Sequence, residues 1–468
     1  MDYISTRGEA PTLPFDDVLL TGLARDGGLY LPSTWPLFSA DEIGGFADLG
    51  YVELAGRLLS PFVEEVIPRP RFAAILAEAY ADFGHAAIAP LKQLDQRLWL
   101  QELFHGPTLA FKDYALQVVG RLFDEVLEAR GKRITIVGAT SGDTGSAAIE
   151  ACRDRERVEI FILHPKGRVS EVQRRQMTTV DSANVHNLAI EGSFDDCQDL
   201  VKAMFNDQAF RDEVSLGAVN SINCARILGQ IVYYFAAAVA LGAPDRPVSF
   251  AVPTGNFGNV FAGYAARQMG LPVEKLIVAS NVNDILTRFF ESGAMVAEAV
   301  QPSLSPSMDI QISSNFERLL FDLLERDGAA VRETLETFRS SGRFELAPER
   351  WQQALEVFSG YRLDDAGTLA AIDRVRRRTG ELLDPHSVIG VAAAEAHLDR
   401  VAGPIVALAT AHPAKFPDAV ERASGVRPQL PPRLADLYER EERMQTLPKD
   451  LAAIQEEVRR VIALKGAA

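Results

Sequence analysis

The sequence has few of the residues that build disulfide scaffolds or metal sites. Only three cysteines occur among 468 residues, and Cys152, Cys197 and Cys224 form no C-x-x-C pair. Such spacing supports neither a disulfide framework nor a zinc site, so a reducing compartment is the default. The seven histidines show no H-E-x-x-H pattern or similar ligand spacing. We therefore expect no metal centre.

Long hydrophobic runs are also missing. The most apolar stretch, Ile231 to Ala243, is shorter than the roughly 18 residues that would indicate a membrane span. The first ten residues, MDYISTRGEA, place Asp2, Arg7 and Glu9 where a secretory signal needs an apolar run. We expect a soluble, cytoplasmic protein.

Positive charge is in deficit. The chain has 48 Lys and Arg against 64 Asp and Glu, a net charge of −16, with a pI near 5.0. This balance argues against nucleic acid and anionic membranes as partners, but not against a small phosphorylated ligand, which depends on local charge. The hydrophobic fraction of 47% is enough for a large core. At roughly 150 residues per domain, we expect two or three domains.

Short β-branched runs alternate with amphipathic segments from about residue 131 onward. The runs are RITIVGAT, VEIFILHP, ANVHNLAI, VSFAVP, KLIVAS and, much later, PIVALATA. This alternation is typical of an α/β protein whose parallel sheets are covered by helices on both faces. We predict two such domains, with an N-terminal extension and a helical insertion.

The domain bounds follow from where that alternation is interrupted. Proline, glycine and helical stretches mark the front section, and charged helical patterns mark a later insertion and the tail. The predicted segments are an N-terminal extension at 1–95 that packs on the larger domain, a larger domain at 96–119 and 241–430 with a helical insertion at 315–383, a smaller domain at 120–240, and a helical tail at 431–468.

Three predicted strand-to-helix turns are suited to binding an anion. A helix N-terminus offers free main-chain N–H donors and the positive end of the helix dipole. In parallel sheets, such turns lie beyond the carboxyl ends of the strands, where ligands bind. The three turns are Thr140-Ser141-Gly142-Asp143-Thr144-Gly145, Gly255-Asn256-Phe257-Gly258-Asn259 and Thr410-Ala411-His412-Pro413.

Ordinary turn and N-cap chemistry accounts equally well for any one of these turns. Three in one chain favour anion binding. The common nucleotide patterns are absent, because Gly138 is followed five residues on by Asp143 rather than by a P-loop lysine, and no turn gives G-x-G-x-x-G. Residues 138–142 also miss the G-x-S-x-G hydrolase pattern, since they centre on Thr140.

Lys112 stands at an unusual place for a lysine. It follows a predicted strand ending at Glu102 and lies in the first turn of a long predicted helix, beside Phe111 and Asp113. The helix dipole and the apolar neighbours both disfavour the ammonium form, so we expect a pKa below the ordinary value of about 10.4. A neutral amine forms a Schiff base with an aldehyde. A surface lysine paired with Asp113 is the alternative. Together with phosphate-binding turns, this lysine points to pyridoxal phosphate.

Four motifs in order resemble the threonine synthase family. They are HGPTLAFKD around Lys112, GATSGDTGSAA at 138–148, VPTGNFGN at 252–259 and LATAHPAKF at 408–416. The opening, with YISTRG at 3–8 and DGGLYLP at 26–32, resembles the longer bacterial and yeast-like branch. The resemblance implies the fold of type II pyridoxal-phosphate enzymes, related to the tryptophan synthase β-chain. It also implies that the larger domain binds the cofactor and that the smaller domain binds the substrate.

The resemblance also implies a role for each matched position. Lys112 matches the catalytic lysine that forms the Schiff base, and Thr410 matches the residue that hydrogen-bonds the pyridine nitrogen. The loop matched to the cofactor phosphate comprises Gly255, Asn256, Phe257, Gly258 and Asn259. The loop matched to the substrate carboxylate comprises Thr140, Ser141, Gly142, Asp143 and Thr144, with Asp143 near the cofactor ring hydroxyl. Asn220 and Arg226 match groups that bind the substrate phosphate, to which a guanidinium can bind bidentately.

The implied reaction converts O-phospho-L-homoserine and water into L-threonine and phosphate. Two alternatives remain open at this point. One is a dehydratase or phospholyase using the same cofactor and releasing an oxo acid, and the other is a non-catalytic or nucleotide-binding protein on a similar frame. As partners we expect a small-molecule substrate, no nucleic acid and no membrane, in a monomer or homodimer.

Overall fold

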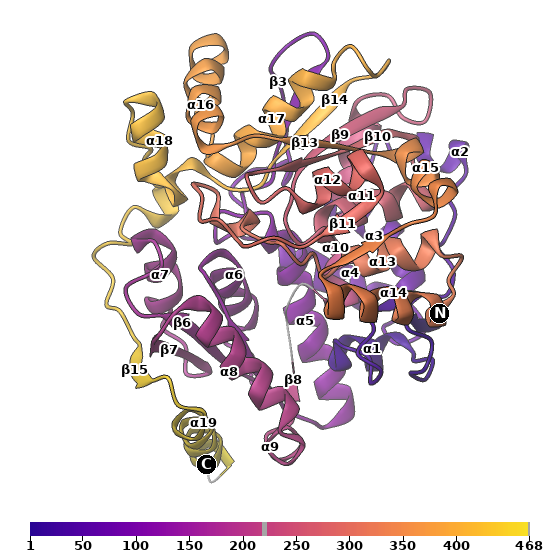
Figure 1. The fold of residues 1–468 in the computed structure, drawn as a ribbon. Coiled ribbons are helices and arrows are strands. Elements are labelled where there is room, and N and C mark those ends of the chain that lie inside the picture. Colours follow the sequence, from indigo (N-terminus) through magenta and orange to yellow (C-terminus); the bar gives the residue numbers. More distant parts are fainter. Residues whose placement is uncertain (218–221, 467–468) are drawn as a thin grey trace. The chain divides into compact units, whose positions relative to one another are not determined.

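The computed structural model describes residues 1–217 and 222–466 (Figure 1). The chain divides into two compact units, each with its own sheet, and the predicted α/β class with two parallel sheets is confirmed. Unit 1 comprises Met1–Val18, Leu23–Ala115 and Ser221–Pro428, and unit 2 comprises Leu19–Gly22, Leu116–Asn220 and Gln429–Ala468. Among the described residues, none of the helices combines the length and apolar composition needed to cross a bilayer.

Unit 1 is built on a six-stranded sheet with the order β13-β10-β9-β14-β4-β3. All neighbouring strands are parallel except β3, which runs antiparallel to β4. The strands are β3 (Leu91–Gln93), β4 (Leu98–Glu102), β9 (Val248–Pro253), β10 (Val273–Ser280), β13 (Phe358–Arg362) and β14 (Ile405–Ala409). Two short antiparallel pairs join β1 (Tyr3–Ser5) to β2 (Tyr30–Pro32) and β11 (Ala294–Val296) to β12 (Arg343–Glu345).

Helices surround this sheet, most of them in the segments between its strands. Those before β4 are α1 (Phe15–Thr21), whose last residues belong to unit 2, α2 (Ala40–Gly44), α3 (Tyr51–Val63) and α4 (Arg69–Tyr80). Those that follow are α10 (Cys224–Ala240), α11 (Gly258–Gln268), α12 (Ile285–Ser292), α13 (Phe316–Leu323), α14 (Gly328–Ser341), α15 (Pro348–Val357), α16 (Asp365–Thr379), α17 (Pro385–His397) and α18 (Pro417–Ser424), with short 3-10 turns at Pro306–Met308 and Pro413–Lys415.

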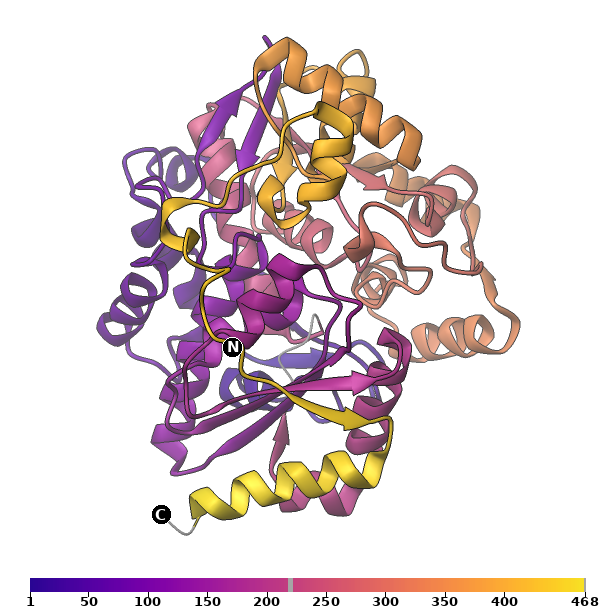
Figure 2. The same cartoon turned by 90° about the vertical axis from the view of Figure 1, so that its left-hand side faces the viewer.

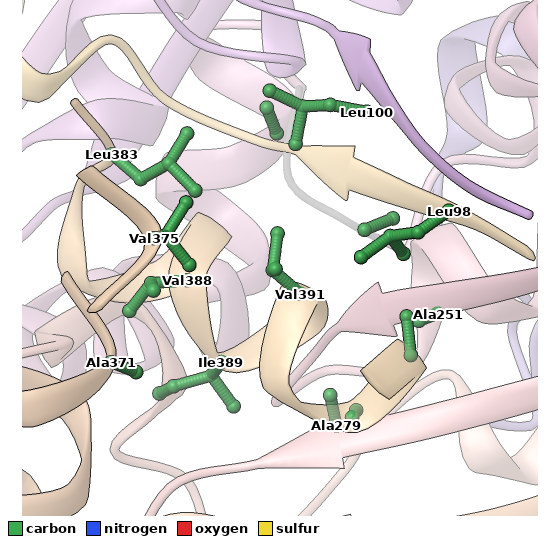
Figure 3. Close-up of a cluster of buried hydrophobic side chains, with 14 of the residues drawn as sticks. Leu98, Leu100, Ala251, Ala279, Ala371, Val375, Leu383, Val388, Ile389 and Val391 are labelled. Carbon is green, nitrogen blue, oxygen red and sulfur yellow. The ribbon is translucent and has the colours of Figure 1, made fainter. Parts of the chain in front are cut away.

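The core of unit 1 lies where α16 and α17 pack on the sheet. Asp384 caps the first turn of α17, and Pro385 occupies the first helical position, where its missing N–H costs nothing. Most of α17 is buried, because the helix lies against β9, β10 and β14. Figure 3 shows the side chains gathered there from β4, α16 and α17, among them Leu98, Leu100, Val375, Val388 and Val391.

Unit 2 contains a five-stranded, wholly parallel sheet with the order β15-β7-β6-β5-β8. Its strands are β5 (Ile134–Ala139), β6 (Val158–Pro165), β7 (Val185–Glu191), β8 (Leu216–Gly217) and β15 (Gln445–Pro448). Its helices are most of α5 (Lys112–Arg130), α6 (Asp143–Cys152), α7 (Glu171–Thr178), α8 (Phe194–Asn206), α9 (Gln208–Glu213) and α19 (Leu451–Gly466), with a 3-10 turn at Pro432–Leu434.

Two segments that the sequence predicts to be helical also contain strands. In the tail, β15 pairs with β7 at the edge of the unit 2 sheet, and α19 follows it (yellow in Figure 2). In residues 315–383, β13 adds an edge strand to the unit 1 sheet beside β10. By contacts, α10 lies in unit 1 and the tail in unit 2. The functional roles assigned to the domains stay predictions.

Three adjacent strands of unit 1 bring the predicted cofactor residues to one edge, except for Asp143, which lies in unit 2. In the order β9-β14-β4 the strands are parallel, so their carboxyl ends lie at the same edge of the sheet. Gly255–Asn259 follows β9, Thr410 follows β14 directly, and the turn before Lys112 follows β4. The topology therefore gathers these segments from three distant parts of the chain.

Candidate functional site

The turn before Lys112 is closed by a buried carboxylate. Asp113, which is fully buried, accepts hydrogen bonds from the main-chain N–H of Thr108 at 2.8 Å and from its hydroxyl at 2.7 Å. Between them, Leu109 adopts a left-handed conformation with φ of 63° and is also fully buried. Such a conformation costs a non-glycine residue on the order of 1 kcal/mol, and it persists only where the surroundings fix it. The hydrogen bonds to Asp113 and the burial of Leu109 thus fix the conformation of the turn.

The same turn is hydrogen-bonded to the segment that carries Thr410. Ala110 and Ala411 form an isolated antiparallel bridge. On either side of it, the Phe111 N–H donates to the Thr410 carbonyl at 2.9 Å, and the His412 N–H donates to the Leu109 carbonyl at 3.0 Å. The main chain therefore fixes the spacing between the positions predicted to bind the two ends of a cofactor ring.

A second lysine supports this pair of segments. Lys415 is fully buried, and its Nζ donates to the Thr108 carbonyl at 2.7 Å. Lys415 lies within the LATAHPAKF motif, which predicts no role for it. Its burial depends on a contact between residues more than 300 positions apart in the chain, so local sequence gives no signal for it.

Lys112 opens the long helix α5, as predicted. Its side chain is half-buried, and Nζ lies 5.3 Å from the centroid of the Phe111 ring. The amine therefore stands at the positive end of a 19-residue helix, against an aromatic face.

Thr410 is buried at the end of β14. Its main-chain N–H donates to Ser387 Oγ at 3.0 Å, and Ser387 lies in the first turn of α17. The main-chain N–H of Ser387 in turn donates to the N-cap carboxylate of Asp384 at 3.2 Å. Ser387 could not be predicted as part of the site from the sequence, because a serine near a helix start is ordinary capping chemistry.

The loop after β9 has the geometry of an anion site. Phe257 is the N-cap of α11 in a left-handed conformation, with φ of 64°, and its N–H donates to Thr254 Oγ1 at 3.2 Å. The Phe257 ring is fully buried against Phe290, Phe316 and Phe358. This packing holds the loop in a conformation that a phenylalanine would not otherwise adopt. The first N–H groups of α11 point out of the helix start.

Asn259, in the first turn of α11, provides a test of whether this loop fits a phosphate. Its Oδ1 accepts hydrogen bonds from the hydroxyls of Tyr233 at 2.6 Å and Tyr234 at 2.9 Å, which fixes the orientation of the amide. Its Nδ2 is buried and has no hydrogen-bond partner among the described residues. A buried donor at the start of a helix suits a phosphate oxygen. The residues of this loop therefore fit the phosphate of pyridoxal phosphate.

The predicted carboxylate-binding turn belongs to unit 2. Thr140 Oγ1 accepts the N–H groups of Gly142 and Gly145, both at 2.9 Å, and Gly142 has φ of 146°. A Cβ at Gly142 would lie 2.4 Å from the side chain of Gln173, so only glycine fits. Gln173 Nε2 donates to Asp143 Oδ1 at 2.8 Å. Asp143 is the first residue of α6 and is buried, whereas Ser141 and Thr144 are half-buried. The roles of this turn toward substrate and cofactor stay predictions.

Arg226 and Asn220 are the two residues predicted to bind the substrate phosphate. Asn220 lies outside the described residues. Arg226 lies in the first turn of α10, which begins after the N-cap Asn223, and its side chain is buried. Burial lowers the pKa of the Arg226 guanidinium to about 10.

Clusters of metal ligands are absent from residues 1–217 and 222–466, where no group of three or more His, Cys, Asp or Glu side chains could hold an ion. The pyridoxal-phosphate residues predicted in unit 1, by contrast, are gathered at one sheet edge.

Comparisons with known proteins match almost the whole chain. Residues 2–80 match the family model described as threonine synthase N terminus, residues 85–339 match pyridoxal-phosphate dependent enzyme, and residues 387–458 match threonine synthase, C-terminal. A threonine synthase from Pseudomonas aeruginosa is 58% identical over 456 residues, covering 97% of each chain.

Solved structures agree with these sequence matches. The crystal structure of threonine synthase from Brucella melitensis with PLP bound has a TM-score of 0.96 and 55% identity, covering 98% of this chain and 99% of that one. The structure of threonine synthase from yeast has a TM-score of 0.93 and 38% identity, covering 99% of each chain. The matched regions cover the N-terminal extension, both sheets and the tail. This chain therefore belongs to the threonine synthase family of pyridoxal-phosphate-dependent enzymes.

Proposed function

We propose that the chain converts O-phospho-L-homoserine and water into L-threonine and phosphate, with pyridoxal phosphate held in unit 1. Membership of the family supports the reaction, and the gathering of Lys112, Thr410 and Gly255–Asn259 at one sheet edge supports the cofactor site. When bound, the cofactor supplies an aldehyde for an amine and a ring that delocalises the negative charge left at the substrate Cα.

Each of these three segments has a separate binding task. The amine of Lys112 would hold the cofactor covalently. The hydroxyl of Thr410 would hydrogen-bond the ring nitrogen, and the main-chain N–H groups at the start of α11 would bind the phosphate. The bridge between Ala110 and Ala411 holds the segments that carry Lys112 and Thr410 at a fixed spacing.

Lys112 is the residue we assign to proton transfer. The new hydroxyl ends on Cβ while the phosphate leaves Cγ, so protons must leave Cα and Cβ before the phosphate departs. One flexible amine close to both carbons can take and return these protons in turn. The closed turn formed by Thr108 and Asp113 fixes the point from which that amine reaches.

The substrate itself is bound at its two charged ends. We assign its carboxylate to the turn Thr140–Thr144, which leads into α6, because the start of a helix favours an anion. We assign its phosphate to Arg226 and Asn220. Arginine suits this task because its planar guanidinium can give two parallel hydrogen bonds to phosphate oxygens.

The observation that carries the proposal is the main-chain pairing of the Lys112 and Thr410 segments. The test is product analysis with purified protein and O-phospho-L-homoserine. L-threonine and phosphate in equal amounts are expected. Phosphate accompanied by an oxo acid would instead identify a phospholyase or dehydratase, which releases the unsaturated intermediate before water adds.

The compartment and the assembly belong to the same proposal. We assign the chain to the cytoplasm, because Cys152, Cys197 and Cys224 are buried free thiols. We expect a monomer or homodimer that binds neither nucleic acid nor membrane, and sedimentation of the purified protein distinguishes the two assembly states.

A further inference from the structure

We propose that Asn315, from outside the Gly255–Asn259 loop, donates a side-chain hydrogen bond to the phosphate of the cofactor. This inference rests on the proposed role of that loop. Asn315 stands immediately before α13, in a segment that neither the strand pattern nor the four motifs identified.

The segment that ends at Asn315 is fastened to the loop by its main chain. The Asn315 N–H donates to the Asn256 carbonyl at 3.1 Å, and Ser313 Oγ donates to the Gly255 carbonyl at 2.8 Å. At the other end of the loop, a Cβ added at Gly258 would lie 3.4 Å from Asn315 Nδ2. The amide nitrogen of Asn315 therefore lies directly beside the start of α11.

A buried arginine fixes which way the Asn315 amide faces. Arg318 Nη1 donates to Asn315 Oδ1, so the oxygen of the amide is turned toward Arg318. Arg318 is itself fully buried and is held by the carbonyl groups of Tyr30 and Ile222, to which its Nη2 donates at 3.3 Å and 2.6 Å. Because an amide presents its nitrogen opposite to its oxygen, Nδ2 is directed away from Arg318 and toward Gly258.

That nitrogen lacks an acceptor in the described part of the chain. Asn315 is 0% exposed, and its Nδ2 makes no hydrogen bond to any described residue. An unpaired buried donor is costly, and native structures keep one where a ligand or an ordered water supplies the acceptor. The position of Nδ2 beside a helix start makes an anion the fitting acceptor.

Asn259 has the same arrangement on its own side. Two tyrosine hydroxyls cap its Oδ1, and its Nδ2 is buried without a partner among the described residues. Two amide groups are thus oriented by donors on their oxygen atoms, with both nitrogen atoms left over at one helix start. A phosphate monoester, with three terminal oxygens and close to two negative charges, can accept from both amides and from the main chain.

The substitution Asn315→Asp tests this inference with the smallest change of shape. It keeps an oxygen for Arg318 and replaces the donating nitrogen by an oxygen that repels phosphate. Full-length protein, freed of cofactor, is titrated with pyridoxal phosphate and with pyridoxal, which lacks the phosphate. We expect the dissociation constant for pyridoxal phosphate to rise about 10- to 100-fold, with that for pyridoxal changed less than about twofold.

Three further variants complete the experiment. Asn259→Asp makes the same atom change within the loop and is expected to behave alike. Asn187→Asp makes it at a buried amide of β7, whose Nδ2 donates to the Met177 carbonyl, and should leave the ratio of the two dissociation constants unchanged. Gly258→Ala keeps the Asn315 side chain and adds a methyl group in van der Waals contact with its Nδ2, at 3.4 Å, in the space that the acceptor would occupy. We expect this variant to weaken the binding of pyridoxal phosphate and not that of pyridoxal.

The outcomes separate this inference from the proposed loop. If Asn259→Asp loses phosphate-dependent affinity while Asn315→Asp binds both ligands normally, Asn315 faces a water and the inference fails alone. Equal weakening of both ligands by Asn315→Asp would also overturn it, because the defect would then be one of folding. If neither variant changes the ratio, the phosphate loop itself is misassigned.

Discussion

At the scale of single residues, the greatest chemical demand falls on the Lys112 amine. We expect Lys112→Ala to remove both the visible absorbance of the bound cofactor and the formation of threonine, because no other amine replaces it at the start of α5. Borohydride should abolish the absorbance band of the unsubstituted protein. An unchanged band in Lys112→Ala would exclude the covalent role. Lys112→Arg is the matched control, since it keeps the positive charge without a nucleophilic amine.

Arg226 is the side chain that we assign to the substrate phosphate. It is buried, and burial lowers the pKa of its guanidinium to about 10. Arg226→Met removes this cation, and we expect it to weaken the binding of phosphate to the holoenzyme, because a guanidinium can give two parallel hydrogen bonds to phosphate oxygens.

The matching measurement uses the reaction product. Inorganic phosphate should raise the melting temperature of the unsubstituted holoenzyme, where Arg226 offers a site, and should leave that of Arg226→Met unchanged. A phosphate-dependent rise that persists in the variant would remove Arg226 from the substrate site.

At the scale of elements, the tail strand β15 depends on a carboxylate that precedes it. Glu442 accepts hydrogen bonds from Arg174 Nε at 2.8 Å and from the Thr178 hydroxyl at 2.7 Å. The bond from Arg174 first, together with that from Thr178, lowers the pKa of Glu442 despite its partial burial. These contacts attach the start of the tail to α7 within unit 2.

The sign of the pH effect follows from that lowered pKa. The folded chain binds fewer protons than the unfolded one between the two pKa values, so the contribution of Glu442 is complete above its ordinary pKa, near 4.5, and is lost as the pH falls through the folded value. We expect Glu442→Gln to cost about 1 kcal/mol at neutral pH, a figure reduced for partial exposure, and nothing below that range. Urea unfolding at neutral pH and at a pH below that range measures the two free energies of unfolding. Glu441→Gln, at an exposed neighbour, is the control, and an equal loss there would contradict the assignment.

The strands predicted from the sequence are those with continuous buried runs. β5, β6, β9 and β14 lie within predicted β-branched segments, and β7 and β10 extend one and two residues beyond theirs. These strands were predictable because a strand buried on both faces is largely apolar. β13 and β15 were missed. The residues of β13, FSGYR, are mostly half-exposed, and those of β15, QTLP, are mostly exposed and end in proline. Edge strands of this kind form because a neighbour presents a free edge, which local sequence does not record.

The site divides in the same way. Loops that follow strands were predicted by position, because parallel sheets place ligands at the carboxyl ends of strands. The left-handed conformations of Leu109 and Phe257 could not be predicted from the sequence, since neither residue type favours them and distant packing imposes both. The supporting contacts of Lys415, Ser387 and Asn315 join segments far apart in sequence, so single-chain patterns contain no trace of them.

At the scale of the whole molecule, all three thiols are protected. Cys152, Cys197 and Cys224 are buried, and burial raises their pKa values to about 12, about 11 and about 11. Because the thiolate is the reactive form, we expect no thiol to react with Ellman's reagent in the native protein at pH 8, and all three to react in urea. A thiol that reacts rapidly in the native protein would show that its surroundings open locally.

Chain order has a consequence for how the smaller sheet is made. β7 is synthesised early, but its neighbour β15 follows only after every strand of the unit 1 sheet. While the ribosome works through the intervening segment, β7 presents an unpaired edge that is open to pairing with other nascent chains. β15, the last strand to be synthesised, thus covers the free edge of β7. Substitutions that weaken this pairing would reduce the yield of folded enzyme in the cell before they affect turnover.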